Sequence, residues 1–167
     1  LIGLRALIFF FLLFILLKPE LEFKNSYILK NRIAVLVDDT KSMLIKTFPS
    51  EQPRIDFVRQ AFDKNWGALK SLSNTFQVDY YFASDQIDPI SAVELREHYR
   101  PKKSNTDFGR VFSNLSARYE GKSLQGVMFF SDGADLMTKP ETISAEFLSL
   151  LTSWEGPIHT FQAGDNH

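Results

Sequence analysis

Two short, strongly apolar runs, each followed at once by an acidic loop, constrain the fold of this chain most tightly. Residues 33–37 read IAVLV and are followed by Asp38, and residues 124–130 read LQGVMFF and are followed by Ser131 and Asp132. A strand that is apolar at nearly every position is typical of the centre of a sheet covered by helices on both faces. The two runs therefore predict buried central strands of a parallel sheet.

Strand and helix patterns alternate along the rest of the chain. Apolar residues at helical spacing, together with capping residues, predict helices over 54–72, 107–119 and 138–154. Other apolar or alternating runs predict strands over 76–83 and 157–163, with 86–93 as an antiparallel edge strand. Residues 94–106 are predicted to form a polar loop or a short helix. This order indicates an α/β fold with a Rossmann-like, mainly parallel sheet flanked by helices.

Three polar clusters fall at the edge of the predicted sheet where its parallel strands end. Residues 38–42 (DDTKS) follow the first buried strand, residues 131–133 (SDG) follow the second, and residues 104–107 (SNTD) precede the second helix. Ligands bind at this edge in open α/β sheets. Carboxylate and hydroxyl oxygens are the hard ligands that Mg²⁺ or Mn²⁺ prefers. Because the three clusters offer few carboxylates, a divalent ion bound to them would keep a net positive charge. Such an ion can take a partner's carboxylate as a further ligand.

Together the three motifs resemble the von Willebrand factor type A (VWA) domain. In that family a buried strand ends in D-x-S-x-S, a second loop supplies a Thr, and a later apolar strand ends in T/S-D-G. The corresponding motifs occur here in the same order between residues 32 and 165. The resemblance implies a metal-ion-dependent adhesion site (MIDAS), in which three loops hold Mg²⁺ (or Mn²⁺) and an acidic side chain of another protein completes the coordination. It implies a protein-binding module and not an enzyme.

The resemblance assigns a role to each matching residue. It implies that Thr40, Ser42 and Thr106 bind the metal directly, while Asp38 and Asp132 bind it directly or through water. Thr40 keeps the hydroxyl group of the family's Ser and adds a methyl group, so ligation depends on its rotamer.

Other interpretations of the same residues stay open. Lys41 stands where Gly is common in the family, and its charge favours a structural VWA-like domain whose metal site has lapsed. Paired acids after a first strand, such as Asp38 and Asp39, also occur in Mg²⁺-dependent phosphoryl-transfer enzymes, and in this alternative Asp38 is the nucleophile. The sequence DDTKS, however, is not the D-x-D-x-T motif of such folds. Thr106 as a helix N-cap and Asp132 as a turn residue are the plain structural alternatives.

The N-terminal segment has a different character. Residues 1–17 (LIGLRALIFFFLLFILL) are apolar apart from a glycine and Arg5, and this length is the lower limit for spanning a bilayer. We predict a transmembrane helix over 1–19, a connector over 20–31 and a VWA-like domain over 32–167. A signal-peptide core and a buried helix are the alternatives.

An apolar helix, a short connector and then this domain are similar to bacterial membrane-anchored VWA proteins of the aerotolerance type. The similarity implies a cell-membrane protein, single-pass in this chain, with an extracytoplasmic domain. Such relatives usually carry an earlier helix and continue with one more strand and helix. We therefore expect the chain to be truncated at both ends.

Composition argues against a nucleic-acid partner and excludes cysteine chemistry. The formal net charge of −1 argues against a nucleic-acid partner, because such proteins usually carry a basic excess. The chain has no cysteine, which excludes disulfides, thiolate zinc sites and cysteine nucleophiles.

Overall fold

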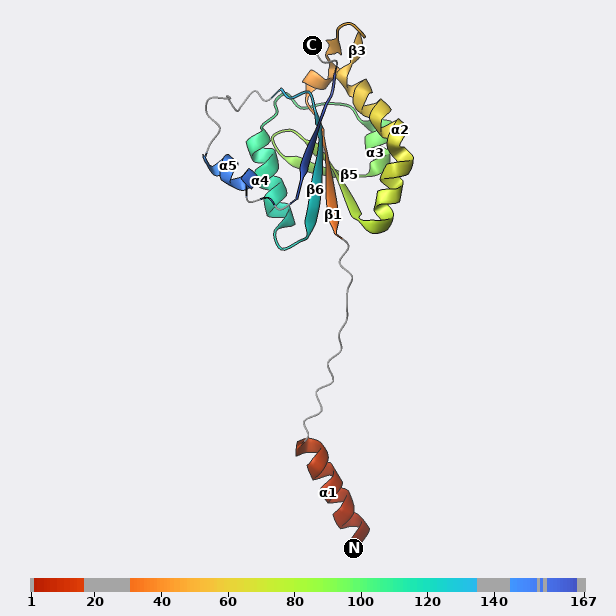
Figure 1. Ribbon diagram of the computed structural model, residues 1–167, viewed down its shortest axis with the longest axis vertical. Coiled ribbons are helices and arrows are strands. Elements are labelled where there is room, and N and C mark those ends of the chain that lie inside the picture. The colour runs from red at the N-terminus through yellow and green to blue at the C-terminus, as the bar shows by residue number, and fades with distance from the viewer. Residues whose placement is uncertain (1, 17–30, 135–144, 153, 155, 165–167) are drawn as a thin grey trace.

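A five-stranded sheet with the strand order β5-β4-β1-β6-β7 forms the centre of the molecule (Figure 1). The computed structural model describes residues 2–16, 31–134, 145–152, 154 and 156–164. The strands are β1 (Arg32–Asp38), β4 (Gln77–Ala83), β5 (Ile87–Ile90), β6 (Leu124–Ser131) and β7 (Ile158–Gln162). All neighbouring strands are parallel except β4 and β5, which are antiparallel. The predicted α/β fold with a mainly parallel sheet is therefore confirmed.

Helices cover both faces of this sheet (Figure 1). The helices around the sheet are α2 (Arg54–Thr75), α3 (Ala92–His98), α4 (Phe108–Tyr119) and α5 (Ala145–Thr152). Residues 34–38 of β1 are fully buried, and their side chains alternate between the two faces. Ala34 and Leu36 belong to the core cluster that includes α4, whereas Val35 and Val37 belong to the cluster that includes α2. Burial on both faces explains why this strand is apolar at every position from 33 to 37.

The helix predictions agree with the structure in kind and differ at the ends. Helix α2 continues to Thr75, beyond its predicted end at residue 72. Helix α4 begins after Asp107, whose carboxylate accepts a hydrogen bond from the Arg110 amide at 3.0 Å and is therefore the N-cap. The structural alternative for Thr106, that it is the N-cap of this helix, is therefore wrong by one position. The predicted start of the last helix, at residues 138–141, lies outside the described residues.

Strand β5 is shorter than the predicted strand over 86–93. Ser91 caps helix α3 by accepting a hydrogen bond from the Glu94 amide at 3.0 Å, so the chain leaves the sheet there. Between β1 and α2 the chain forms a short 3₁₀ helix, η1 (Lys41–Leu44), and an antiparallel pair, β2 (Lys46–Thr47) and β3 (Gln52–Pro53).

The apolar N-terminal segment forms helix α1 (Ile2–Leu16), and the rest of the predicted transmembrane helix, residues 1 and 17–19, lies outside the described residues. Its apolar side chains are exposed, among them Ile2 at 86% and Phe9 at 75%. No helix among the described residues combines the length and the apolar character needed to cross a bilayer. Nearly all of the predicted connector lies outside the described residues.

Candidate metal centre

The parallel sheet brings the first and third polar loops together. Val37 of β1 pairs with Phe130 of β6, so the next residues, Asp38 and Ser131, lie side by side where the strands end. The Ser131 hydroxyl donates a hydrogen bond to Asp38 Oδ2 at 2.7 Å. Both side chains are buried, and Asp38 is 0% exposed. The centre of the candidate site is therefore a carboxylate fully removed from bulk solvent.

The first loop folds back onto this carboxylate. The amide and the hydroxyl group of Thr40 both donate to Asp38 Oδ1, at 2.9 and 2.6 Å. The hydroxyl groups of Thr40 and Ser42 lie 2.8 Å apart. Because an Asp side chain readily accepts from its own backbone two residues on, the D-x-T spacing itself favours this turn.

Backbone hydrogen bonds bring the second loop to the first. The amides of residues 102 and 103 both donate to the carbonyl of Asp39 at 2.9 Å, and Thr40 forms an isolated parallel bridge with residue 103. Thr106 follows this contact and is 2% exposed. Its Oγ1 lies 3.5 Å from each carboxylate oxygen of Asp38 and 3.4 Å from Thr40 Oγ1. Residues from two loops far apart in sequence thus reach one carboxylate.

The spacing of these oxygens suits a small divalent ion. Neighbouring ligands of octahedral Mg²⁺ are about 3 Å apart, because each lies 2.0–2.1 Å from the ion. The side-chain oxygens of Asp38, Thr40 and Thr106 lie 2.6–3.5 Å apart, and Ser42 Oγ lies 2.8 Å from Thr40 Oγ1. Within the described residues no group of three or more His, Asp or Glu is placed to hold a metal. Any metal here would therefore depend on hydroxyl ligands.

Asp132, the fifth predicted ligand, has a different partner. Its Oδ2 forms an ion pair with Arg54 Nη1 at 2.5 Å, and its Oδ1 accepts the Ala134 amide at 3.0 Å. The Asp132 side chain is only 1% exposed. Four of the five predicted ligands, Asp38, Thr40, Ser42 and Thr106, thus form one hydrogen-bonded cluster. The fifth, Asp132, forms an ion pair with Arg54 instead.

The cluster leaves the charge of Asp38 without a cation among the described residues. Within the described part of the chain, its carboxylate accepts only from the Thr40 amide and from hydroxyl groups. Burial raises the pKa of Asp38, hydrogen bonds from Thr40 and Ser131 oppose that rise, and the charge of Asp132 adds to it. A divalent ion would reverse this balance, because it favours the charged carboxylate.

Asp39 is a second buried acid beside the cluster. Burial raises its pKa from 3.8 to about 6, against the opposing effect of the nearby Lys102 and Lys103. Its Oδ1 is the one buried side-chain N or O atom among the described residues without a hydrogen-bond partner. Lys41, in contrast, has an exposed side chain.

Three contacts at this centre do not follow from the sequence pattern. Ser131 belongs to the third polar cluster, but nothing in its spacing predicts that it donates a hydrogen bond to Asp38. Arg54 is predicted only as the start of a helix, and its ion pair with Asp132 could not be predicted. The buried hydroxyl group of Tyr99, whose pKa burial raises, donates to the Asp38 carbonyl. No periodicity marks these partners, because each contact joins distant parts of the chain.

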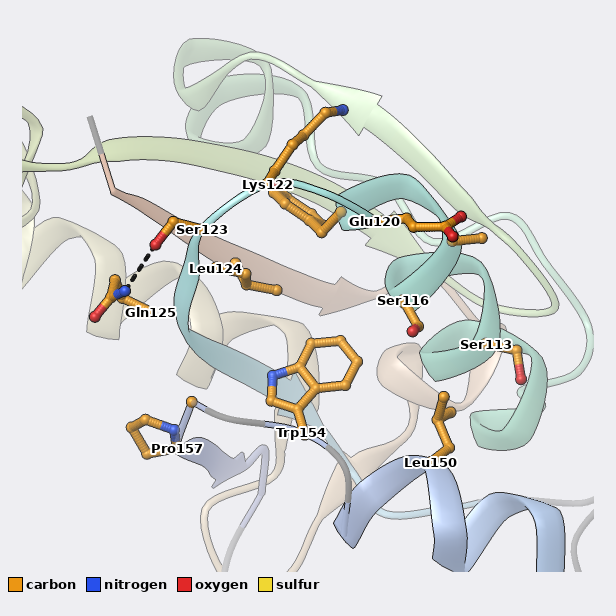
Figure 2. Close-up of a pocket in the computed structure, with 13 residues that line it drawn as sticks. Ser113, Ser116, Glu120, Lys122, Ser123, Leu124, Gln125, Leu150, Trp154 and Pro157 are labelled. Carbon is orange, nitrogen blue, oxygen red and sulfur yellow. Dashed lines mark hydrogen bonds between the residues drawn. The ribbon is translucent and has the colours of Figure 1, made fainter. Parts of the chain in front are cut away.

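A cavity of about 780 Å³ lies at the opposite end of the sheet, between the end of α4, the start of β6 and the segment after α5. Figure 2 shows Trp154, Leu150 and Leu124 around it, with exposed Ser123 hydrogen-bonded to Gln125 at 2.8 Å. Its polar side chains are mostly open to solvent. The carboxyl end of the sheet is therefore the stronger candidate, because its polar groups are buried and converge.

No protein-family model matches this chain, and no curated protein matches it at a significant level.

Proposed function

We propose that this chain is a VWA-like protein-binding module that uses Mg²⁺ or Mn²⁺ to take a carboxylate from an acidic partner protein. The observation that carries the proposal is the buried Asp38 carboxylate with three hydroxyl groups around it, at the end of a parallel sheet where ligands bind. The strand order and the antiparallel β5 are compatible with a VWA-like fold.

In this proposal the hydroxyl groups of Thr40, Ser42 and Thr106 and the carboxylate of Asp38 hold the ion, and Asp132 reaches it directly or through water. The ion would supply positive charge for the partner's carboxylate. Asp38 fixes the rotamers of its neighbours, because Thr40 and Ser131 already donate to it. The chain's own residues thus orient ligands, and no step of covalent chemistry is assigned to them.

Calorimetric titration of the full chain, kept in a mild detergent, with Mg²⁺ and with Mn²⁺ tests the metal site. Wild type should bind saturably, Asp38→Ala should not bind, and Asp79→Ala should bind as wild type does. Asp79 is the matched control because it is an acid of the neighbouring strand β4 that already has Arg32 as its partner. A folded wild type that binds neither ion contradicts the proposal.

A lapsed metal site in a structural domain is the second candidate. The ion pair between Arg54 and Asp132 favours it, because a guanidinium group already neutralises one of the predicted ligands. Absence of binding in wild type, together with an unchanged fold, is the result that this candidate expects.

We also propose that the apolar N-terminal segment attaches the protein to the cell membrane, with the domain on the extracytoplasmic side. The support is the exposed apolar surface of α1, since a large exposed apolar surface is typical of a segment that contacts a membrane or another protein. The full chain should stay with membranes after a high-salt wash and be released by detergent. Complete recovery of the intact chain in the salt-washed supernatant contradicts attachment.

A further inference from the structure

The ion pair at the candidate metal centre joins two residues with very different surroundings. Asp132 lies at the end of β6 with its side chain 1% exposed, whereas the Arg54 side chain is 27% exposed. Arg54 Nη1 lies 2.5 Å from Asp132 Oδ2. The partly exposed Arg54 guanidinium group therefore forms an ion pair with a buried Asp132 carboxylate.

The position of Arg54 is set by the fold around it. Its amide, at the start of α2, donates to the Ile45 carbonyl at 3.1 Å. Its side chain lies across Gly164, where an added Cβ would be 3.4 Å from Arg54 Cγ and 3.0 Å from Thr47 Cγ2. Gly164 also has a φ of +122°, which favours glycine. The backbone after β7 thus packs closely against Thr47 and the Arg54 side chain.

We propose that Arg54 competes with the divalent ion for Asp132 and so lowers the metal affinity of the site. This inference rests on the proposed metal-binding function. Asp132 Oδ1 accepts the Ala134 amide and its Oδ2 binds Arg54, so an ion that uses this carboxylate must displace or share the guanidinium group. The hydrogen-bonded cluster around Asp38, to which Asp132 does not belong, has no cation bound to it among the described residues.

Calorimetric titration of the full chain in mild detergent with Mg²⁺ alone tests this inference. Arg54→Gln should bind Mg²⁺ about 10- to 100-fold more tightly than wild type, because the ion then no longer has to displace a charged hydrogen-bond donor from Asp132. The matched control is Arg96→Gln, which removes the same charge from helix α3. Its partner Asp63 lies 2.9 Å away, with both side chains exposed. Arg96→Gln should stay within about twofold of wild type.

The background variant Asp132→Asn shows whether the effect passes through this carboxylate. In Asp132→Asn, the added Arg54→Gln change should alter the affinity by less than about twofold, because the competition is already gone. If Arg54→Gln does not fold, Arg54→Lys replaces it. Lysine keeps the charge but loses the planar fork, so a smaller rise in affinity is expected.

Three results overturn the inference. The first is wild-type affinity, or weaker binding, in a folded Arg54 variant while wild type binds Mg²⁺; this leaves the proposed function intact. The second is an equal rise in affinity with and without Asp132, which would indicate a general charge effect. The third is absence of binding in folded wild type and in the folded variant, which overturns the proposed metal site as well.

Discussion

Two carboxylates sit at opposite ends of the same sheet, and their partners differ in kind. Asp79, on β4, accepts from Arg32 Nη1 at 2.8 Å and from the hydroxyl group of Tyr119 at 2.7 Å. Asp38, at the end of β1, accepts from the Thr40 and Ser131 hydroxyl groups at 2.6 and 2.7 Å. The first acid is paired with a cation near the surface, and the second is fully buried without one among the described residues.

This difference separates a structural ion pair from a candidate binding site. The charge of Asp79 is balanced by Arg32 within the fold, so nothing further is needed there. Burying an unbalanced carboxylate is unfavourable, and the raised pKa of Asp38 expresses that cost. A fold that keeps such a group surrounded by hydroxyl oxygens is consistent with a cation bound from outside. The following changes test this contrast.

The largest effect is expected at Asp39, the buried neighbour of Asp38. Its pKa is about 6 in the folded protein, above the ordinary 3.8, so folding favours its protonated form. Wild type should therefore lose stability as the pH rises from about 4 to 6, by about 2–3 kcal/mol at pH 7. Asp39→Asn should recover most of this loss at pH 7 and none of it below pH 4. Urea unfolding with a chelator present, repeated across this range, measures the difference.

Asp85→Asn is the control for this measurement, because Asp85 is exposed. It should leave the pH profile unchanged. An Asp39→Asn protein whose stability follows the wild-type profile would show that the Asp39 carboxylate is not disfavoured by its surroundings.

An intermediate effect on the free energy of unfolding is expected when the acids at the two ends of the sheet are neutralised in turn. Without metal, Asp79→Asn should lower the free energy of unfolding by about 1–2 kcal/mol, because Arg32 and Tyr119 lose a charged acceptor. Asp38→Asn should change it by less than about 1 kcal/mol, because burial disfavours the charged carboxylate and hydroxyl donors can reorient. Urea unfolding in a chelator measures both values. A larger loss of stability for Asp38→Asn than for Asp79→Asn would contradict the contrast between an acid paired with a cation and an acid without one.

The smallest effect compares two serines at opposite ends of β6. Ser131→Ala removes the donor to Asp38 and the acceptor of the Gly133 amide, so a loss of about 1 kcal/mol is expected. Ser123→Ala removes only an exposed contact with Gln125 and should stay within about 0.5 kcal/mol. Thermal unfolding of both variants beside wild type is sufficient. Equal effects would mean that burial at the carboxyl end adds nothing to the value of a hydroxyl group.

The local pattern of the sequence determined the central strands, helices α2 and α4, and the three polar loops. Residues 33–37 and 126–130 are apolar because helices cover both faces of their strands, and this pattern can be seen in the sequence alone. The parallel order of strands then places Asp38 and Ser131 at one edge. For this reason the approach of Asp38, Thr40, Ser42 and Thr106 could be predicted from the order of the motifs along the chain.

Only the tertiary structure decided which further groups reach this centre. Arg54 and Asp132 are separated by 78 positions, and Tyr99 and Asp38 by 61. No spacing rule links residues so far apart, because their contact depends on how α2, the loop after α3 and the end of β7 pack around the sheet. The sequence could place the acid at the strand end, but packing determined that an arginine, and not solvent, lies against Asp132.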